Sequence, residues 1–475
     1  MDLPRQPLLF AMFIALSTAL APAQQEWETL FDGKSLAGWK AAEHPDSVKV
    51  VDGMIYCDGP RAHLFYLGAD GKAEFENFEL ELEVKAMPGA NSGVYFHATW
   101  QDAGWPRQSG TEVQVNNTQP AFDKNYIENK KTGSLYGFRN LYKAMARDSE
   151  WFTLNIQVRK PRVQVRINGK LMIDYIEPSN VPVLVPGATR DILTKGTFAL
   201  QCHDEKSQAW FRNIRVRRLP PGEDASVTKP VYNDADRARQ VLARDNFPLV
   251  NLRTYLGSRL TLEQLHALRN QTGIFPGVVY QAASDGVVRD DVTALAAIAA
   301  LKDEPVFVGL DVSNDLAQGS HTLPLETEAK FDFLMADSSR VIFELFGQSG
   351  ESWMDAVVAN IVRKIETLPI DVFANVMMVP TTWTEERMQR VIAAAAANGV
   401  AFEINPQERT PSEQFIKLAK AAGVRFTVGG NLTTTEDYAD WSYILEMQKA
   451  AGLNWRNMYV PGHEPTRAQR ELKKL

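Results

Sequence analysis

Apolar and polar residues alternate along several short segments in the first part of the chain. The clearest segments are FENFELELEVKAM, NSGVYFHATW, EWFTLNIQVRK, RVQVRINGKLMIDYI and GTFALQCHD. Residues two apart in a strand point to the same face, so this alternation predicts half-buried β-strands. Asn168 and Gly169 lie between two alternating runs and predict a tight hairpin. Many short strands without a convincing helix predict an all-β jelly-roll sandwich over residues 25–219.

The pattern changes after residue 219. The segment LPPGEDASVTKPVYNDAD is rich in Pro, Gly and acidic residues, and it predicts a linker over residues 220–232. In residues 233–475, amphipathic helices such as TEERMQRVIAAAAANG alternate with short apolar strands such as PVFVGLDV. Repeated strand–helix units predict a parallel sheet that closes into a TIM-like α/β barrel of seven or eight strands.

The composition narrows the classes of function. The chain has 475 residues, of which 45% are hydrophobic and 23% are charged, as in a globular protein of two or three domains. A net charge of −7 without a Lys/Arg run argues against nucleic acid or anionic lipid as a partner. The two cysteines, Cys57 and Cys202, form either a disulfide or two buried free thiols.

The first residues have the pattern of an export signal. Arg5 precedes the apolar run LLFAMFIALSTALA, which ends in Ala21-Pro22-Ala23. This pattern predicts a signal peptide over residues 1–23, and an exported protein of the periplasm or the extracellular space. A single membrane anchor is the alternative, but the run is shorter than the ~20 residues that a span needs. After cleavage we expect no membrane association.

Three of the predicted strands carry polar residues at alternate positions, between core-forming residues. The strands are NSGVYFH, TEVQVNN and FALQCH, and their alternate polar residues are Asn91, Tyr95, His97, Glu112, Gln114, Asn116, Gln201 and His203. Amides and carboxylates pair with sugar hydroxyls, and Tyr packs on the apolar face of a sugar. The pattern therefore favours a sugar or metal site on one face of a sheet. The alternative is a solvated sheet face with a few satisfied histidines.

The order of these segments is similar to a known family. WETLFDGKSLAGWK, ANSGVYFH, TEVQVNN, KTGSLYG, EWFTLNIQVRKPRVQVRINGK and FALQCHD together resemble the 3-keto-disaccharide hydrolase domain, over roughly residues 26–219. The resemblance implies a concanavalin-like jelly roll in an exported, carbohydrate-active hydrolase that cleaves 3-keto-glycosides. A carbohydrate-binding protein with the same pocket and no catalysis is the alternative.

The chemistry that the resemblance implies makes definite demands on the site. A ketone at C3 of a sugar acidifies the C2 proton, and removal of that proton lets the enolate expel the glycosidic oxygen. Elimination or hydrolysis then needs a base, an electrophile for the enolate oxygen, and a proton donor for the leaving group. We expect His203 to be the base, with Glu112 as second choice. A divalent metal held by Glu112, His97 and His203 is one electrophile, and Arg212 or a neutral His is the alternative.

Other residues are expected to bind substrate. The set combines the amides and aromatic residues of the strands with two loop residues and one arginine: Asn91, Tyr95, Gln114, Asn116, Lys131, Tyr136, Gln201 and Arg212. Asp204 points to the opposite face of a regular strand, and could orient His203 only if the strand ends there.

The second half resembles the polymerase-and-histidinol-phosphatase (PHP) family. AFEINPQERTPSEQFIKLAKAAGVRFTVGGNLTTTEDY matches the last third of that family, whose members bind metal ions for phosphoester hydrolysis. The family's metal-binding Asp and His would fall on Asn431 and Thr433. Its opening Asp-x-His-x-His motif would fall on Asn251, Arg253 and Tyr255.

These departures predict a barrel without metal ligands, because Asn and Thr bind divalent ions poorly without carboxylate neighbours. We expect a metal-free PHP-like barrel over residues 233–475 that serves as a scaffold or a subunit interface. A third use is an altered pocket built on Arg253, Glu403 and Arg409. The alternative to all three is phosphoesterase activity in the barrel.

Overall fold

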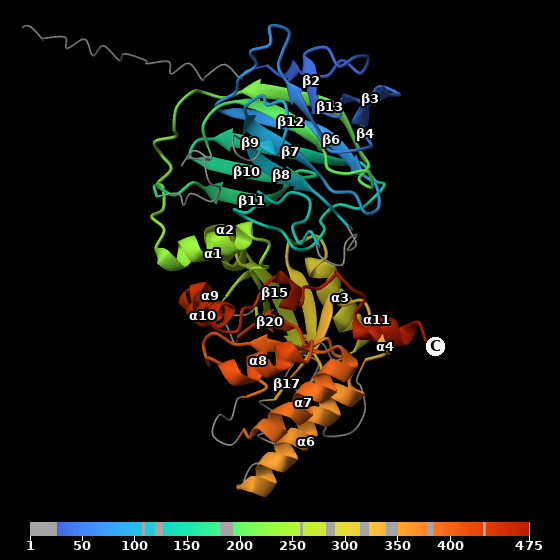
Figure 1. Ribbon diagram of the computed structural model, residues 1–475, viewed down its shortest axis with the longest axis vertical. Helices are drawn as coiled ribbons and strands as arrows, with labels where there is room; N and C mark the ends of the chain where they lie inside the picture. Colours follow the sequence, from blue (N-terminus) through green and yellow to red (C-terminus); the bar gives the residue numbers. More distant parts are fainter. Residues whose placement is uncertain are drawn as a thin grey trace, which may run out of the picture.

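The computed structural model describes residues 26–106, 110–118, 127–180, 193–256, 260–281, 290–313, 323–338, 350–377, 383–430 and 434–474. They form a β-sandwich followed by an α/β barrel, one above the other in Figure 1. None of the helices in these ranges is both long and apolar enough to span a membrane. The predicted signal peptide, residues 1–23, lies outside the described residues.

Two antiparallel sheets make the sandwich, as the alternation predicts. The larger sheet has eight strands: β1 (Glu28–Thr29), β3 (Val48–Val51), β4 (Met54–Cys57), β6 (Phe78–Ala86), β9 (Phe152–Arg159), β10 (Arg162–Ile167), β11 (Lys170–Ile176) and β13 (Ala209–Arg218). The smaller sheet has the order β2 (Trp39–Glu43), β5 (Ala62–Tyr66), β12 (Thr197–Cys202), β7 (Ser92–Ala98) and β8 (Thr111–Val115). A short 3-10 helix, η1 (Pro45–Ser47), follows β2.

The two sheets differ in how their faces are covered. Along β6, buried residues alternate with half-buried ones, which is typical of a strand with one solvated face. Strands β7, β8 and β12 are buried at every position. The polar face of the smaller sheet is therefore covered by other parts of the chain, and its polar side chains need hydrogen-bond partners there.

Two local predictions can be compared with the structure. Asn168 and Gly169 have φ values of +50° and +79° and join β10 to β11, so the predicted hairpin is confirmed. Both φ values match the type of two-residue turn that follows the twist of the strands. Cys57 and Cys202 are both buried free thiols. A hydrogen bond with Cys202, together with burial, raises the pKa of Cys57.

Seven parallel strands close into the barrel among the described residues, which confirms the predicted α/β barrel. The strands are β14 (Val250–Thr254), β15 (Phe275–Gln281), β16 (Phe307–Asp311), β17 (Phe333–Asp337), β18 (Val372–Ala374), β19 (Ala401–Ile404) and β20 (Phe426–Val428). The helices are α1 (Asp234–Arg244), α2 (Leu262–Thr272), α3 (Asp291–Leu301), α4 (Leu325–Glu328), α6 (Glu351–Thr367), α7 (Glu385–Asn398), α8 (Glu413–Ala421), α9 (Thr435–Ala439), α10 (Ser442–Ala450), η5 (Trp455–Asn457) and α11 (Arg467–Leu472).

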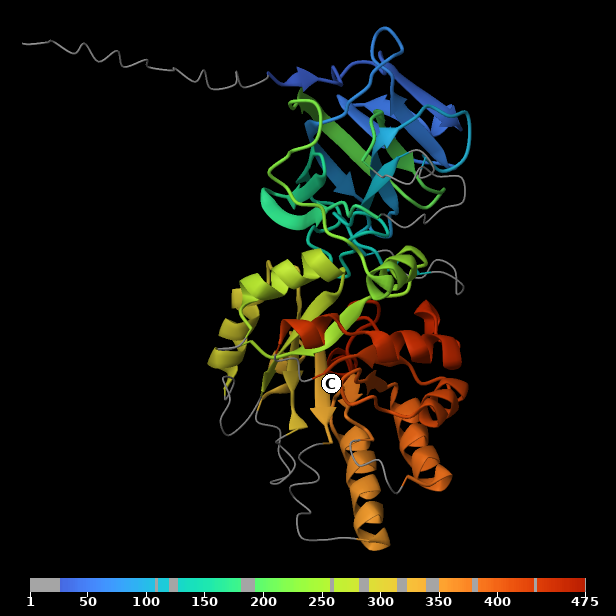
Figure 2. The same ribbon diagram turned by 90° about the vertical axis from the view of Figure 1, so that its left-hand side faces the viewer.

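The sandwich sits on the amino-terminal ends of the barrel strands. The Leu249 amide, just before β14, donates to the Tyr142 hydroxyl at 3.1 Å. Lys143 Nζ donates to the Val306 carbonyl at 3.1 Å and to Asp332 Oδ2 at 2.8 Å, just before β16 and β17. The carboxyl ends of these strands point away from the sandwich (Figure 2). Enzymes built on such barrels place their sites at the carboxyl ends, so the sandwich covers the opposite end.

The interface has a buried apolar centre and specific polar contacts. Tyr142 of the sandwich packs edge-on against Phe275 at the start of β15, with ring centroids 5.8 Å apart. Arg139 Nη2 donates to the Tyr232 hydroxyl at 2.7 Å and to the Gln271 carbonyl at 2.6 Å. Arg139 is only 5% exposed, and its charge is satisfied by groups from the barrel half. These aromatic and hydrogen-bond contacts fix the sandwich against the barrel half.

Candidate functional site

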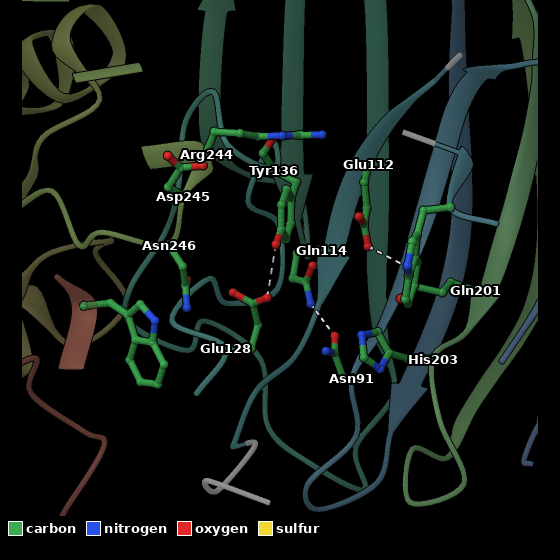
Figure 3. A pocket seen from close by; sticks show the side chains of 12 residues that line it. Asn91, Glu112, Gln114, Glu128, Tyr136, Gln201, His203, Arg244, Asp245 and Asn246 are labelled. Atoms are coloured by element: carbon green, nitrogen blue, oxygen red, sulfur yellow. Dashed lines mark hydrogen bonds between the residues drawn. The ribbon is translucent and has the colours of Figure 1, made fainter. Parts of the chain in front are cut away.

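A pocket of about 380 Å³ lies between the smaller sheet and the barrel, within the range of ~300–1,000 Å³ that is usual for small-molecule sites. In Figure 3, Glu112, Gln201 and His203 lie on one side, and Arg244 and Asp245 lie on the other. The full lining comes from both halves of the chain: Asn91, Trp105, Glu112, Gln114, Glu128, Tyr136, Gln201, His203, Arg244, Asp245, Asn246 and Trp455.

Glu112 is held on both of its carboxylate oxygens. It stands on β8, directly opposite Tyr95 of β7, and β12 lies on the other side of β7. The Tyr95 hydroxyl donates to Oε2 at 2.7 Å, and Gln201 Nε2 donates to Oε1 at 3.1 Å. A Cβ at position 93 would lie 2.5 Å from Oε1, so the glycine there makes room for the carboxylate. Three adjacent strands therefore fix one buried acid, which is 6% exposed.

Asn91 and Gln114 form a second ordered pair in the pocket. The Gln114 side-chain Nε2 donates to Asn91 Oδ1 at 2.6 Å. The backbone N–H of Asn91 donates to Ser207 Oγ at 2.9 Å. Both side chains are buried and line the pocket. Paired amides of this kind bind hydroxyl groups through donor and acceptor together.

His203 and Asp204 make a hydrogen-bonded dyad at the pocket edge. Strand β12 ends at Cys202, so Asp204 is free of the alternation and turns back toward its neighbour. His203 Nδ1–H donates to Asp204 Oδ2 at 2.7 Å. Burial alone would raise the pKa of Asp204, but hydrogen bonds from His203 and the Lys206 amide hold this pKa below its ordinary value. The carboxylate thereby orients the imidazole. The sequence allowed this role for Asp204 only if the strand ended before it, and β12 does end at Cys202.

Trp105 adds an aromatic ring beside this dyad. Its indole centroid lies 5.0 Å from the His203 ring, and the Arg61 guanidinium stacks over it at 4.8 Å. Trp105 is half-buried and lines the pocket. An indole in this position offers a flat apolar surface next to the imidazole.

A buried loop supplies the floor of the pocket between the sheet and the barrel. Tyr136 binds β8 through its amide, which donates to the Glu112 carbonyl at 2.9 Å, and its hydroxyl donates to Glu128 Oε2 at 3.4 Å. Lys130 Nζ lies 4.3 Å from the Tyr136 ring centroid and 3.4 Å from Glu128 Oε1. Burial disfavours the Lys130 charge, but the Glu128 carboxylate raises the pKa of Lys130 above its ordinary value.

The barrel half closes the other side of the pocket. Helix α1 begins with a capping box between Asn233 and Asp236 and ends at Arg244. Asn246 follows with a φ of +65°, and its Oδ1 accepts from Lys130 Nζ at 2.8 Å. Its Nδ2 donates to the Ile127 carbonyl at 2.7 Å. The end of α1 is therefore tied directly to the loop of the sandwich.

His97 does not belong to this pocket, so the placement predicted for it is wrong. Its φ of +53° breaks the alternation, and its ring packs against Phe78 and Phe96, with centroids 5.6 and 5.2 Å away. Nε2–H donates to the Glu76 carbonyl at 2.8 Å. A left-handed residue turns the side chain away from the face that a regular strand would present.

Tyr95, whose hydroxyl holds Glu112, does not itself line the pocket, and three other predicted residues also lie outside the lining. Arg212 stands on the larger sheet, paired with Glu83 and stacked over the Trp151 ring at 4.0 Å, so its predicted place in the site is wrong. Asn116 Nδ2 donates to the Glu128 and Lys130 carbonyls at 3.2 and 3.1 Å, which supports the loop rather than a ligand.

Lys131 is the third of these residues. Its side chain is buried and does not line the pocket. Burial lowers the pKa of Lys131 to about 8, and the Glu128 and Asp148 carboxylates oppose this shift only in part. A buried lysine of this kind reports a desolvated environment.

The predicted metal set of Glu112, His97 and His203 does not assemble, because His97 faces the core. Within the ranges that the structure describes, no group of three or more His, Cys, Asp or Glu residues is arranged to hold a metal ion.

Several lining residues were not predicted from the sequence. They come from a loop beside the sheet and from the barrel: Trp105, Glu128, Arg244, Asp245, Asn246 and Trp455. Glu128 stands three residues before Lys131, on a loop that the sequence had already indicated as part of the site through Lys131 and Tyr136. The barrel residues join the site only through the contact between the two halves, which leaves no local pattern.

The centre of the barrel holds a buried arginine, Arg253, on β14. Arg253 Nε and Nη2 each donate to Glu403 at 2.7 Å, and Nη1 donates to Asp337 Oδ2 at 2.9 Å. Nη2 also donates to Asn375 Oδ1 at 3.1 Å. Burial disfavours the charge, but Glu403 and Asp337 raise the pKa of Arg253, which is 1% exposed. The guanidinium thus supplies the positive charge among these carboxylates.

Of the three residues proposed for an altered barrel pocket, Arg409 lies apart from the other two. Arg409 pairs with Glu446, and both side chains are 53% exposed, so Arg409 does not join Arg253 and Glu403. Asn251 Oδ1 accepts from the Arg253 amide at 3.2 Å. Burial raises the pKa of Tyr255. Two further positions of the family pattern, residues 431 and 433, lie outside the described residues.

Comparisons with known proteins agree with the resemblance in the first half. Residues 26–217 match the family model of the 3-keto-alpha-glucoside-1,2-lyase-like domain. A 3-keto-disaccharide hydrolase from Bacteroides thetaiotaomicron is 26% identical over 229 residues, which cover 40% of this chain and 78% of that protein. Residues 26–217 are therefore similar in sequence to this lyase-like family domain and to the Bacteroides hydrolase. The family model ends before the barrel begins.

Solved structures that match part of this chain include two crystal structures assigned as glycosyl hydrolases from Parabacteroides distasonis. One is 21% identical with a TM-score of 0.35, and the match covers 41% of this chain and 94% of that chain. The other is 26% identical with a TM-score of 0.33, covering 41% of this chain and 100% of that chain.

Proposed function

We propose that this protein is an exported enzyme that cleaves 3-keto-glycosides in the pocket of the sandwich. The observation that carries the proposal is the His203–Asp204 dyad, which lies in the same pocket as the fixed carboxylate of Glu112. The family model and the Bacteroides relative suggest the keto-sugar substrate. A carboxylate behind an imidazole is the arrangement that sets the tautomer of a general base.

The proposed reaction starts at C2 of the keto sugar. His203 Nε2 accepts the C2 proton, because Nδ1–H is engaged by Asp204. The C–H electron pair forms the enolate, whose collapse forms the C1–C2 double bond and breaks the bond from C1 to the glycosidic oxygen. The imidazolium then gives its proton to the departing oxygen. The products are a 2-hydroxy-3-keto-glucal and the free alcohol, and later addition of water to the double bond completes a net hydrolysis.

The remaining pocket residues bind and orient the sugar. Asn91, Gln114 and Gln201 present amides toward hydroxyl groups, and the Glu112 carboxylate accepts a hydrogen bond from a ring hydroxyl. The Trp105 indole beside His203 packs on an apolar face of the sugar. Positioning of this kind keeps C2 within reach of the imidazole.

For the barrel we propose a metal-free, PHP-like scaffold. The ion pairs of Arg253 with Glu403 and Asp337 favour this role over phosphoester hydrolysis, since the guanidinium occupies the carboxylates that a metal would need. Export by a signal peptide over residues 1–23 is part of the same proposal.

The test is incubation of the purified protein with methyl 3-keto-glucoside and with the unoxidised methyl glucoside. We expect a glucal or 3-keto-glucose and free methanol from the keto compound only. If calorimetry detects binding of the keto compound but no product forms, the protein is a carbohydrate-binding protein and not an enzyme for this substrate. Neither binding nor product would overturn the proposal.

A further inference from the structure

The barrel wall of the pocket has no role in the chemistry proposed above. We use the term barrel wall for the four lining residues that the barrel half contributes: Arg244, Asp245, Asn246 and Trp455. Proton removal from C2 needs His203 and its carboxylate partner, which both belong to the sandwich. The barrel wall is nevertheless ordered by specific contacts, so its position in the pocket has a structural cause.

Contacts across the interface fix the barrel wall against the sandwich. Arg244 Nη1 donates to the Tyr136 carbonyl at 3.3 Å, and its guanidinium lies 5.4 Å from the Tyr136 ring centroid. Asn246 is 7% exposed and binds Lys130 and the Ile127 carbonyl, while Asn129 Nδ2 donates to the Asn246 carbonyl at 2.9 Å. Asn246 is a positioning residue, because its amide is used by the loop.

The pocket has room beyond the keto sugar. Glu112, Gln201 and His203 lie on one side of it, and Arg244, Asp245 and Asn246 of the barrel wall lie on the other (Figure 3). A keto sugar whose C2 faces His203 lies against the sheet. With the sheet side of the pocket taken by the keto sugar, the barrel wall is the side left for the substituent on C1. A volume of about 380 Å³ is within the range of ~300–1,000 Å³ for small-molecule sites.

The chemistry of the barrel wall fits a sugar as this substituent. The half-buried Trp455 offers an indole face for the apolar side of a pyranose ring. Arg244 and Asp245 offer a donor and an acceptor for hydroxyl groups. Asp245 is exposed to solvent, and a hydroxyl of a sugar leaving group would take the place of water on its carboxylate.

We infer that the barrel wall is the subsite for the leaving sugar of a 3-keto-disaccharide, so that the barrel selects the substrate that the sandwich cleaves. This inference rests on the proposed function, and it gives the barrel a binding role that a scaffold lacks. Trp455 is the residue that carries most of the selection, because its indole provides the largest contact surface.

The experiment compares a 3-keto-glucosyl-glucose disaccharide with methyl 3-keto-glucoside on the full-length protein. We expect Trp455→Ala to lower the ratio of kcat/KM for the disaccharide to kcat/KM for the methyl compound by about fivefold or more. Trp455→Phe keeps an aromatic face and should restore part of the ratio. The control is Trp353→Ala, the same change at a half-buried tryptophan on α6 outside the pocket, which should leave the ratio unchanged.

The outcomes separate the inference from the proposed function. An unchanged ratio in Trp455→Ala, with both compounds still cleaved, overturns the subsite and leaves the enzyme in place. If the wild-type protein cleaves neither compound, the proposed function fails, and calorimetric titration with the disaccharide decides the subsite alone. A weaker Kd in Trp455→Ala than in wild type then supports the subsite, and equal values overturn it.

Discussion

Replacement of Arg253 by leucine tests whether the barrel is held by an internal cation in place of metal. Arg253 is 1% exposed and donates four hydrogen bonds of 2.7–3.1 Å to Glu403, Asp337 and Asn375. Its removal leaves two buried carboxylates without their counter-charge. Removal of one partner of a buried ion pair costs ~3–5 kcal/mol, so we expect a loss of this size in the free energy of unfolding at neutral pH.

The loss should depend on pH in a defined direction. Burial raises the pKa of Glu403, and Arg253 opposes this shift, so the leucine variant has a still higher carboxyl pKa in the folded state. The folded variant then binds a proton that the unfolded chain does not bind, and its stability rises as pH falls. The difference from wild type should therefore shrink between about pH 7 and about pH 5.

Urea unfolding followed by circular dichroism at the two pH values measures this difference. The matched control is Arg409→Leu, which breaks the exposed pair with Glu446 and should cost less than about 1 kcal/mol. A loss in Arg253→Leu no larger than that of the control, or a loss that grows as pH falls, would refute the reasoning.

Two further substitutions probe the sandwich. Asp204→Asn removes the carboxylate that orients His203, so we expect kcat to fall about 10- to 100-fold with little change in KM. Steady-state kinetics on methyl 3-keto-glucoside measure both constants. An unchanged kcat with a raised KM would contradict an orienting role. Lys131→Met removes a buried amine whose pKa is lowered to about 8. The unfolded chain holds that proton up to the ordinary value of 10.5, so wild-type stability should rise by ~3 kcal/mol relative to the variant between these pH values. The variant should exceed wild type in stability at pH 7 by a similar amount, and urea unfolding across this pH range checks both points.

The alternation of polar and apolar residues was sufficient to predict the sandwich and five of the twelve described residues that line its pocket. Period-two patterns depend on the local geometry of a strand, which the sequence carries directly. The strands β7, β8 and β12 lie side by side, so Glu112, Gln114 and Gln201 meet in one pocket. The barrel could also be predicted, because the alternation of amphipathic helices with short apolar strands is likewise a local pattern of the sequence.

The failures have physical causes that no local pattern contains. His97 leaves the predicted face because its backbone takes a left-handed φ, and Arg212 belongs to the larger sheet, whose strand order the sequence does not state. Arg244 and Trp455 reach the pocket only because the sandwich docks on the amino-terminal end of the barrel. Contacts between residues more than a hundred positions apart depend on the tertiary fold.

The most direct test of the account is the kcat/KM of His203→Ala on methyl 3-keto-glucoside. His44→Ala, the same change at an exposed histidine of the sandwich outside the pocket, is the control. If His203 removes the C2 proton, its loss lowers kcat/KM by ~10²–10⁴-fold, whereas the control retains wild-type activity. Retention of wild-type kcat/KM in His203→Ala would contradict the assignment of the base and the site built around it.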